Sequence, residues 1–318
     1  MASSERACVD VVVPTRRAAA LVERCIEHLV DVTIASRIVV DDASGDDTVQ
    51  RLSGRTGVEV VSLPTQRGLA YAYNRGAELG VAPLLLFLNN DILPAPGAVD
   101  RLVAGLQAHA GAGSAAGRLV DEPTEETQLS YAPRAVPGPA AVVARLVGVE
   151  RYWPRNPLTG QHLRRPLPED RATLTRRQPA GACLLVRRSD HERLGGWDER
   201  YWIWYEDVDY SRRLLEIGSA LYEPRAVFRH LGGASTGQWD KPQQHRRLYH
   251  GTLQYGSAHF GPAGRAVVGA AAATVALPRI VRYRRSDPSA AAVYRDVLWG
   301  AIALMRGGVV PSMMPRQR

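Results

Sequence analysis

Over the first 120 residues, short apolar runs alternate with longer amphipathic stretches, and no other feature of the sequence constrains the fold as strongly. Strands that alternate with helices in this way are typical of βαβ units, which build a parallel sheet covered by helices. The apolar runs predict buried strands at residues 9–14, 37–42, 58–63 and 84–88, and the amphipathic stretches predict helices at 17–30, 68–79 and 97–110. The sequence therefore predicts an α/β fold with a mostly parallel central sheet.

The pattern changes after residue 120 and again after residue 240. Residues 121–178 are rich in proline and arginine and show little periodicity, which is typical of an irregular insertion that carries substrate-selecting loops. Regular patterns then predict a strand at 182–187, a helix at 206–217, a strand at 226–230, and two alanine-rich helical segments beyond Lys241 that are separated by 279–288. We expect one domain over residues 1–240, followed by a basic helical extension over 241–318.

The net charge of +8 is concentrated in this extension. Residues 241–318 hold 12 basic and 2 acidic side chains, whereas residues 1–240 hold 28 basic and 30 acidic ones. Apolar runs at 266–277 and 297–305 are each followed by arginines, a pattern typical of helices that lie in the headgroup plane of an anionic membrane. The alternative is a pair of helices that pack on the body or on a second copy in a homodimer. Nucleic acid is disfavoured, because no aromatic-interleaved basic surface accompanies the charge.

Other features bear on the location of the chain. Its longest apolar run, 266–277, has 12 residues, fewer than the roughly 20 that a membrane-spanning helix needs. Residues 1–9 carry charges where a secretory signal would be apolar. The three cysteines form no C-x-x-C pair, so neither a disulfide framework nor a cysteine zinc site is expected. We expect a cytoplasmic protein, associated peripherally with the inner face of the plasma membrane.

Polar residues follow several of the predicted strands. They are Pro14-Thr15, Asp41-Asp42, Asn89-Asn90-Asp91 and, after the last strand, His230. In open α/β sheets, ligands bind at the carboxyl ends of the strands. Each group alone is also explained by turns and helix caps, but their joint placement favours a ligand site.

Asp91 is the candidate metal ligand of this set. A single carboxylate after a buried strand, flanked by Asn89 and Asn90, suits a hard cation such as Mg²⁺ that bridges a diphosphate. His230 could add a nitrogen ligand, which Mn²⁺ tolerates better than Mg²⁺. The alternative for His230 is a packed structural histidine.

The densest cluster of aromatic and acidic residues lies between residues 194 and 213. It contains Trp197, Trp202, Trp204 and Tyr205 beside Asp198, Glu199, Glu206, Asp207 and Asp209. Aromatic faces beside carboxylates suit a sugar site, and a partly desolvated carboxylate could act as a general base. The alternative is an aromatic core patch with an acidic first turn on the helix that begins near Glu206.

At this point the chain resembles a known family. The segments VDVVVPTRRAAALVERCIEHL, VVDDASGDDT, RGLAYAYNRG, LFLNND, GACLLVRR, GGWDERYWIWYEDVDYSRRL and FRHLGGAS follow in order the pattern of family 2 inverting glycosyltransferases. Within that family the chain is most similar to the bacterial rhamnosyltransferase-like group that builds cell-wall or surface polysaccharide. The resemblance extends from Val9 to Ser235.

The resemblance implies a GT-A fold, with a nucleotide-binding half at about 1–120 and an acceptor-binding half at about 121–240. It implies nucleotide contacts for Pro14, Thr15, Asp41, Arg67, Gly68, Asn74 and Asn90, and acceptor or sugar contacts for Trp197, Asp198 and Glu206. Asp207 would be the catalytic base, Asp91 a metal ligand, and His230 a ligand of the metal or the diphosphate. The sequence departs from the family in having Asn-Asn-Asp instead of an Asp-x-Asp motif, and Gln66 where many relatives have Asn.

The predicted activity is transfer of a sugar, with inversion, from a nucleotide-sugar to a hydroxyl of a lipid-linked or polysaccharide acceptor, with Mg²⁺ or Mn²⁺ as cofactor. The resemblance points to dTDP-L-rhamnose as the donor. One alternative is a sugar-nucleotide pyrophosphorylase, which is disfavoured because residues 14–17 lack the glycines of a phosphate loop. The other is a non-catalytic glycan-binding protein that keeps the fold.

Overall fold

The computed structural model describes residues 8–154, 156–159, 167–232 and 239–313, so the prediction about an N-terminal signal and the end of the FRHLGGAS motif lie outside the described residues. The chain divides into two compact units. The first, which we call the sheet unit, comprises Met1–Arg134, Pro166–Glu199 and Asp207–Ser235. The second, the helical unit, comprises Ala135–Arg165, Arg200–Glu206 and Thr236–Arg318. The single domain expected over residues 1–240 stays a prediction.

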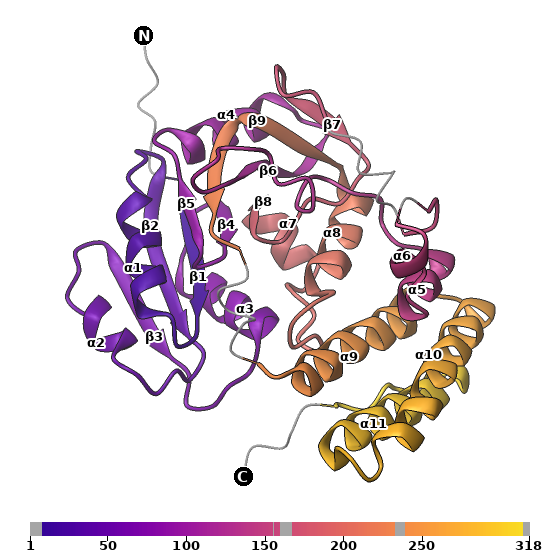
Figure 1. Ribbon diagram of the computed structural model, residues 1–318. Helices are drawn as coiled ribbons and strands as arrows, with labels where there is room; N and C mark the ends of the chain where they lie inside the picture. Colours follow the sequence, from indigo (N-terminus) through magenta and orange to yellow (C-terminus); the bar gives the residue numbers. More distant parts are fainter. Residues whose placement is uncertain (1–7, 155, 160–166, 233–238, 314–318) are drawn as a thin grey trace. The chain divides into compact units, whose positions relative to one another are not determined.

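The described strands of the sheet unit form one nine-stranded sheet, ordered β3-β2-β1-β4-β8-β6-β9-β5, with β7 paired to β9 (Figure 1). Their bounds are β1 Val9–Thr15, β2 Ile34–Asp41, β3 Val58–Ser62, β4 Leu84–Leu88, β5 Ile92–Pro94, β6 Ala112–Asp121, β7 Thr173–Thr175, β8 Cys183–Arg187 and β9 Ser219–His230. The α/β class predicted from the alternating pattern is confirmed.

Strand direction determines which ends share an edge of the sheet. Strands β3, β2, β1 and β4 pair in parallel, and so do β6 and β9. Strand β8 runs antiparallel to both β4 and β6, so β6 and β9 run in the same direction as β4. The carboxyl ends of β1, β2, β4 and β9 therefore lie along one edge. This edge carries Thr15, Asp41, Asn90-Asp91 and His230.

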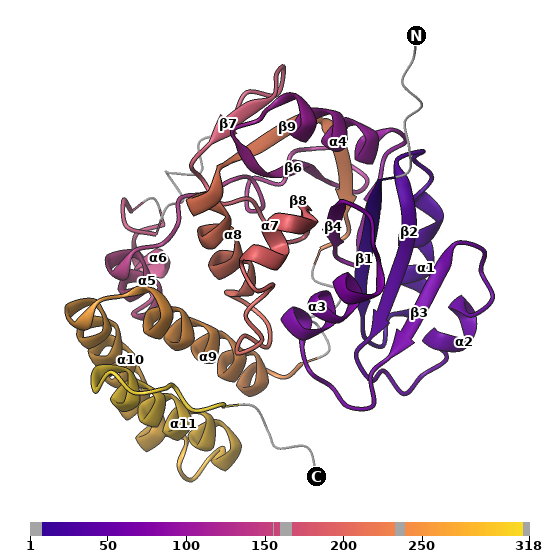
Figure 2. The same ribbon diagram turned by 180° about the vertical axis from the view of Figure 1, so that it is seen from behind.

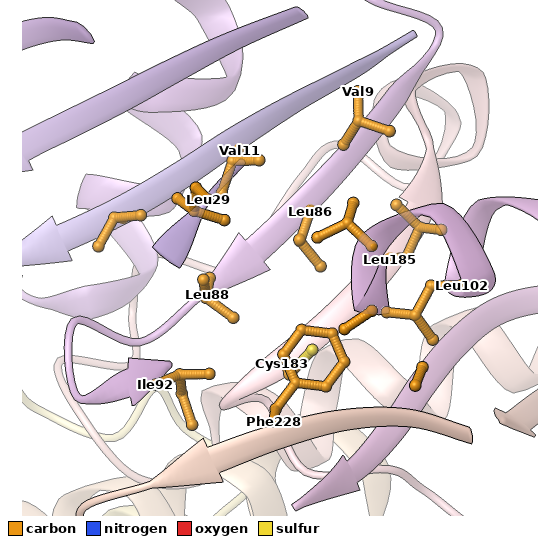
Figure 3. Close-up of a cluster of buried hydrophobic side chains, with 14 of the residues drawn as sticks. Val9, Val11, Leu29, Leu86, Leu88, Ile92, Leu102, Cys183, Leu185 and Phe228 are labelled. Carbon is orange, nitrogen blue, oxygen red and sulfur yellow. The ribbon is translucent and has the colours of Figure 1, made fainter. Parts of the chain in front are cut away.

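Helices cover both faces of this sheet because alternate residues of a strand point to opposite faces. Val11 and Val13 of β1 belong to a core cluster with α1 (Ala19–His28) and α4 (Ala98–Ala108), part of which Figure 3 shows. Val12 faces a second cluster, formed with α3 (Leu69–Leu79) and α8 (Glu206–Ile217). Accordingly, α1 lies in front of the sheet in Figure 1 and α3 lies in front of it in Figure 2. Two short helices, α2 (Thr48–Leu52) and α7 (Arg188–Arg193), complete the unit.

The helical unit contains α5 (Pro139–Leu146), α6 (Val149–Tyr152), α9 (Lys241–His259), α10 (Pro262–Tyr283) and α11 (Pro288–Met305). Helix α10 packs on α11 and α5, and α11 packs on α9. Asp240 and Asp287 cap α9 and α11 by accepting hydrogen bonds from backbone N–H groups, and a proline in the first turn of each helix needs no such partner.

By length and composition, one helix among the described residues, α10, is long and apolar enough to cross a membrane. The uninterrupted apolar run 266–277 is shorter than this helix, which begins at Pro262 and continues through Pro278 to Tyr283. A buried helix of a water-soluble protein can meet the same criterion, so length alone does not assign α10 to a membrane.

Candidate active site

The ends of β1 and β4 are joined by a buried hydrogen bond. The Asn90 side-chain amide donates to the Thr15 hydroxyl over 3.0 Å, and both residues are buried. Pro14 precedes Thr15 in β1, where it lies opposite Val40 of β2. Three residues expected to contact the nucleotide are thus held at one edge of the sheet.

Two adjacent carboxylates at the end of β2 have different partners. Asp41 accepts hydrogen bonds from the hydroxyls of Ser44 and Ser62, the latter over 3.0 Å. Asp42 accepts the backbone N–H groups of Arg67 and Gly68 over 2.6 and 3.0 Å. Burial raises the pKa of Asp42, and these two N–H donors act in the opposite direction.

Asp42 thereby fixes the turn that precedes α3. Gly68, the residue before the helix, has a φ of 91°, which glycine adopts without a steric penalty. The Arg67 guanidinium lies 4.0 Å above the ring of Tyr71, a cation–π contact. From the sequence, Asp42 was expected only as one of the polar residues at a strand end, and in the structure it supports both Arg67 and Gly68.

Asp91 and His230 face each other across the edge of the sheet. Asp91 Oδ1 is 3.6 Å from His230 Nε2, and both side chains are buried. The pairing of β5 with β9 brings them together, since Ile92 lies opposite His230. Oδ1 of Asp91 makes no hydrogen bond within the described part of the chain.

The tautomer of His230 follows from its other neighbour, Gln128. The Gln128 side-chain NH₂ donates to the Asp121 carboxylate and to the carbonyl oxygen of His230, so its Oε1 accepts from His230 Nδ1 over 2.7 Å. Burial lowers the pKa of His230, against the influence of Asp91 and Asp121. In the neutral ring, Nε2 therefore directs a lone pair toward a carboxylate oxygen.

This donor set fits a divalent cation. With His230 neutral, two electron-rich atoms face each other without a shared proton, and burial raises the pKa of Asp91 against the opposing influence of His230 and of a backbone N–H. Within residues 8–154, 156–159, 167–232 and 239–313, no cluster of three or more His, Cys, Asp or Glu side chains is present. Asp91 and His230 would therefore supply two ligands, and diphosphate oxygens and waters the others, as is common for Mg²⁺.

Asp207 lies in the first turn of α8, and one of its oxygens is held by the protein. Oδ2 accepts the Gly181 backbone N–H over 3.3 Å and pairs with Arg134 Nη2 at 3.2 Å. A Cβ atom on Gly181 would lie 2.5 Å from the Cβ of Asp207, so only glycine allows this approach. Asp207 Oδ1 makes no contact of this kind in the described residues, which leaves it available to accept a proton.

The loop that contains Trp197 is attached to α3 through Asn74. The Asn74 amide donates to the Trp197 carbonyl over 2.9 Å and to Glu199 over 3.0 Å, and its oxygen accepts the Trp197 N–H over 2.8 Å. Asn74 thus acts as a structural bracket, and its contact with a nucleotide stays a prediction.

Trp197 itself belongs to the core. Its side chain is 1% exposed, and its ring stacks on Tyr73 and Tyr210 at centroid distances of 4.8 and 4.1 Å. Both faces of the ring are covered by these tyrosines, while its indole N–H has no hydrogen-bond partner in the described residues. The contact of Trp197 with a sugar stays a prediction. The half-buried Asp198 next to it is better placed to contact one.

The residues just before α8 belong to the helical unit. Trp204 and Tyr205 have φ values of 65° and 71°, a backbone conformation that costs energy in any residue except glycine. Helix α9 accommodates this turn because Gly251 has no side chain. A Cβ at that position would collide with the Trp204 carbonyl oxygen. Glu206, which follows the turn, is buried at the start of α8.

Sequence reasoning missed Gln128, Arg134 and Gly181. The first two lie in the stretch that was predicted as an irregular insertion, and no local pattern distinguishes them. Gly181 opens the GACLLVRR segment that carries part of the resemblance, which was the one available signal.

Comparison with known proteins identifies the family of this chain. Residues 10–195 match the sequence model of Glycosyl transferase family 2. An N-acetylglucosaminyl-diphospho-decaprenol L-rhamnosyltransferase of Mycobacterium tuberculosis is 33% identical over 231 residues, which cover 68% of this chain and 72% of that protein. A pre-mycofactocin glycosyltransferase of the same species is 29% identical over 239 residues, covering 73% and 44%.

Two solved structures share the fold. The mannosyltransferase PcManGT of Pyrobaculum calidifontis, in complex with GDP-Man and Mn²⁺, has a TM-score of 0.52 at 17% identity and covers 95% of this chain and 86% of its own. GalNAc-T7, with UDP, GalNAc and Mn²⁺, has a TM-score of 0.53 at 16% identity and covers 72% and 44%. The predicted GT-A fold is thereby confirmed. Because the family model matches more than half of the sequence, this chain is a glycosyltransferase that belongs to Glycosyl transferase family 2.

Proposed function

We propose that this enzyme transfers L-rhamnose from dTDP-rhamnose, with inversion, to a hydroxyl of a lipid-linked sugar in the synthesis of a cell-wall or surface glycan. The proposal for donor and acceptor is supported by the 33% identical relative, whose name specifies L-rhamnosyl transfer to a diphospho-decaprenol-linked sugar. The observation that carries the chemistry is a pair of carboxylates in the sheet unit. Asp91 has a buried oxygen without a hydrogen-bond partner in the described residues, where a cation could bind, whereas Asp207 is held by one oxygen and could take up a proton through the other.

In the proposed reaction, Asp207 acts as the general base. Its Oδ1 removes the proton of the acceptor hydroxyl as that oxygen attacks the anomeric carbon, from the face opposite the departing diphosphate. One C–O bond forms, the bond to the diphosphate breaks, and the proton remains on Asp207. A single displacement of this kind inverts the anomeric configuration.

The leaving group would lie at the Asp91–His230 pair. A divalent cation bound there would neutralise charge that develops on the nucleoside diphosphate, a contribution of several kcal/mol. Asp91 provides the carboxylate ligand, and Gln128 keeps the Nε2 lone pair of His230 directed to the same place. The occurrence of Mn²⁺ in complexes of two proteins of the same fold supports a divalent metal.

The nucleotide would bind along the same edge of the sheet. We assign the pyrimidine ring to Asp41 and the rest of the nucleotide to Pro14, Thr15, Arg67, Gly68 and Asn90. Asp42 and the Asn90–Thr15 hydrogen bond would keep these groups in place before the donor arrives. We assign Asp198 and Glu206 to the sugar or the acceptor.

A lipid-linked acceptor would require access to a membrane surface, and the helical unit has suitable features. Helix α10 exposes Val267, Leu277 and Val281 at 54, 52 and 63% and has no charged side chain between Ala266 and Pro278. At its C-terminal end, Arg282 and Arg284 are exposed. We propose that this face associates peripherally with anionic lipid. The full-length protein should then sediment with phosphatidylglycerol vesicles at low salt and be released at high salt. A protein that stays in the supernatant and dimerises instead would assign the face to a second copy of the chain.

The proposed activity is tested with a panel of nucleotide-sugars, Mn²⁺ or Mg²⁺, and a short-chain polyprenyl-diphosphate-linked N-acetylglucosamine. Transfer from dTDP-rhamnose, with a product whose anomeric configuration by NMR is opposite to that of the donor, is the expected result. Thermal stabilisation by dTDP in preference to UDP and GDP should accompany it. Transfer from another donor would overturn the rhamnose assignment, and retention of configuration would overturn the role of Asp207.

A further inference from the structure

Residues 128–134, which we call the 128–134 segment, contact both carboxylate sites of the sheet unit. The segment follows β6 and is anchored at both ends by backbone hydrogen bonds. Gln128 N donates to Leu119 O over 2.9 Å, and Arg134 exchanges hydrogen bonds of 2.9 and 2.8 Å with Gln178. Between them, Tyr131 N donates to Gln128 O over 2.9 Å. The segment is therefore a short connection with few degrees of freedom.

Gln128 and Tyr131 of this segment contact His230, the proposed metal ligand. Gln128 accepts the Nδ1–H of His230 over 2.7 Å, and the ring of Tyr131 lies edge-on to the imidazole with centroids 4.3 Å apart. Tyr131 also packs on the main core cluster of the sheet unit, so the imidazole is held on two sides. The orientation of Nε2 toward Asp91 thus depends on this segment.

Arg134, the last residue of the segment, contacts Asp207, the proposed base. Arg134 Nη2 lies 3.2 Å from Asp207 Oδ2, the same oxygen that accepts the Gly181 N–H. Rotation of the carboxylate would weaken both contacts. The two donors therefore favour one direction for Oδ1.

We propose that the 128–134 segment sets the position of the base relative to the diphosphate site. Arg134 is the positioning residue for Asp207, and Gln128 is the positioning residue for His230. The proposal rests on the roles proposed above for Asp207, Asp91 and His230. Neither positioning residue takes part in bond making. Each acts by orienting a group that does, at the two ends of one hydrogen-bonded segment, which favours one arrangement of base and leaving group. A misplacement of about 1 Å can cost about 10²-fold in rate.

Arg134→Ala tests the base end. Turnover should fall about 10- to 100-fold, with the KM of the donor and the affinity for dTDP with Mn²⁺ unchanged, because only the orientation of Asp207 is lost. Arg134→Lys, or added guanidinium with Arg134→Ala, should restore part of the turnover. Exchange of the Gly181 amide hydrogen should become faster in Arg134→Ala, a readout that requires no substrate. The matched control is Arg118→Ala, which removes an arginine of similar exposure from an ion pair with Glu169.

Gln128→Ala tests the metal end. The variant should bind Mn²⁺ with dTDP about 10- to 100-fold more weakly by calorimetry, the usual effect of removing a hydrogen-bond partner of a ligating histidine. Gly181 amide exchange should stay unchanged. Gln107→Ala, which removes an exposed glutamine on α4, is the control.

The two variants are expected to have opposite profiles, and the results separate the possible failures. If Arg134→Ala keeps full turnover and normal Gly181 exchange, Arg134 does not position the base. If Gln128→Ala keeps full Mn²⁺ affinity, Gln128 does not position His230. If wild-type protein transfers no sugar, the proposed function fails, whereas amide exchange and calorimetry still decide whether the segment restrains the two sites.

Discussion

Asp91 and Asp207 are both carboxylates of the sheet unit, but the protein compensates their charges very differently. The Asp91 side chain is 6% exposed, has an oxygen without a hydrogen-bond partner in the described residues, and lies 3.6 Å from Nε2 of His230, whose pKa is lowered by burial. The Asp207 side chain is 19% exposed and has an arginine and a backbone N–H on one oxygen. A buried carboxylate oxygen without a hydrogen-bond partner is costly, which supports the proposal of a cation that comes with the ligand. The contacts on one oxygen of Asp207 orient the carboxylate, which supports its proposed role as the base.

The largest expected effect is on turnover, and it comes from a substitution of Asp207. It tests whether the two carboxylates have different roles. Asp207→Asn should lower turnover by about 10²–10⁴-fold, because an amide cannot accept the acceptor proton. Binding of dTDP with Mn²⁺ should be unchanged by calorimetry. Glu216→Gln, an exposed position on the same helix, is the control. A variant that retains more than about a tenth of wild-type turnover would remove Asp207 from this role, and Glu206 would be tested next.

Gly181→Ala should lower turnover by about 10²-fold while the protein still binds nucleotide and metal. The added Cβ would lie 2.5 Å from the Asp207 Cβ, so the base must move, and a shift of about 1 Å can have this effect. Gly111→Ala, where an added Cβ meets nothing within 4 Å, provides the control. Steady-state kinetics decides the outcome, and an unchanged kcat would show that the position of Asp207 is not critical.

Asp91→Ala should abolish the part of dTDP affinity that depends on metal, a loss at least as large as the roughly 10- to 100-fold caused by removing only a hydrogen-bond partner of a ligand. Calorimetry in Mn²⁺ and in EDTA measures it directly. In Asp207→Asn, the difference in dTDP affinity between Mn²⁺ and EDTA should be unchanged. This variant is therefore the matched control for the two carboxylates. Equal affinity of the wild type in Mn²⁺ and EDTA would contradict a metal at Asp91.

The smallest predicted effect concerns stability without ligand. Asp91→Asn should raise the free energy of unfolding by about 1 kcal/mol, because the amide removes a buried charge and its NH₂ can donate to His230 Nε2. Asp207→Asn should lower it by about 0–1 kcal/mol through loss of a partly exposed ion pair. Urea unfolding in EDTA measures both. If Asp91→Asn destabilises the protein, Asp91 has a partner within the fold and the argument for a cation is wrong.

Strands and helices with a clear local pattern were predictable. The continuous apolar run Leu84–Leu88 forms a strand with the predicted bounds, and the helix at Glu206–Ile217 begins and ends as expected. Strand β6 was missed because AGSAAGRLVD has few β-formers. Of its two glycines, Gly117 is required, since a Cβ there would collide with the Ala226 carbonyl oxygen of β9. This strand exists because of its neighbours in the sheet.

The sequence by itself determined the α/β class and placed polar residues at the ends of strands, because periodicity and strand ends are local properties of the chain. It could not distinguish Trp197 as a sugar contact from Trp197 as a core residue, since both environments favour aromatic rings. Only the tertiary structure decided which partners hold Asp207 and His230. Arg134 lies 73 positions from Asp207, and Gln128 lies 102 positions from His230. Contacts over such separations depend on strand order and direction, which no local pattern encodes.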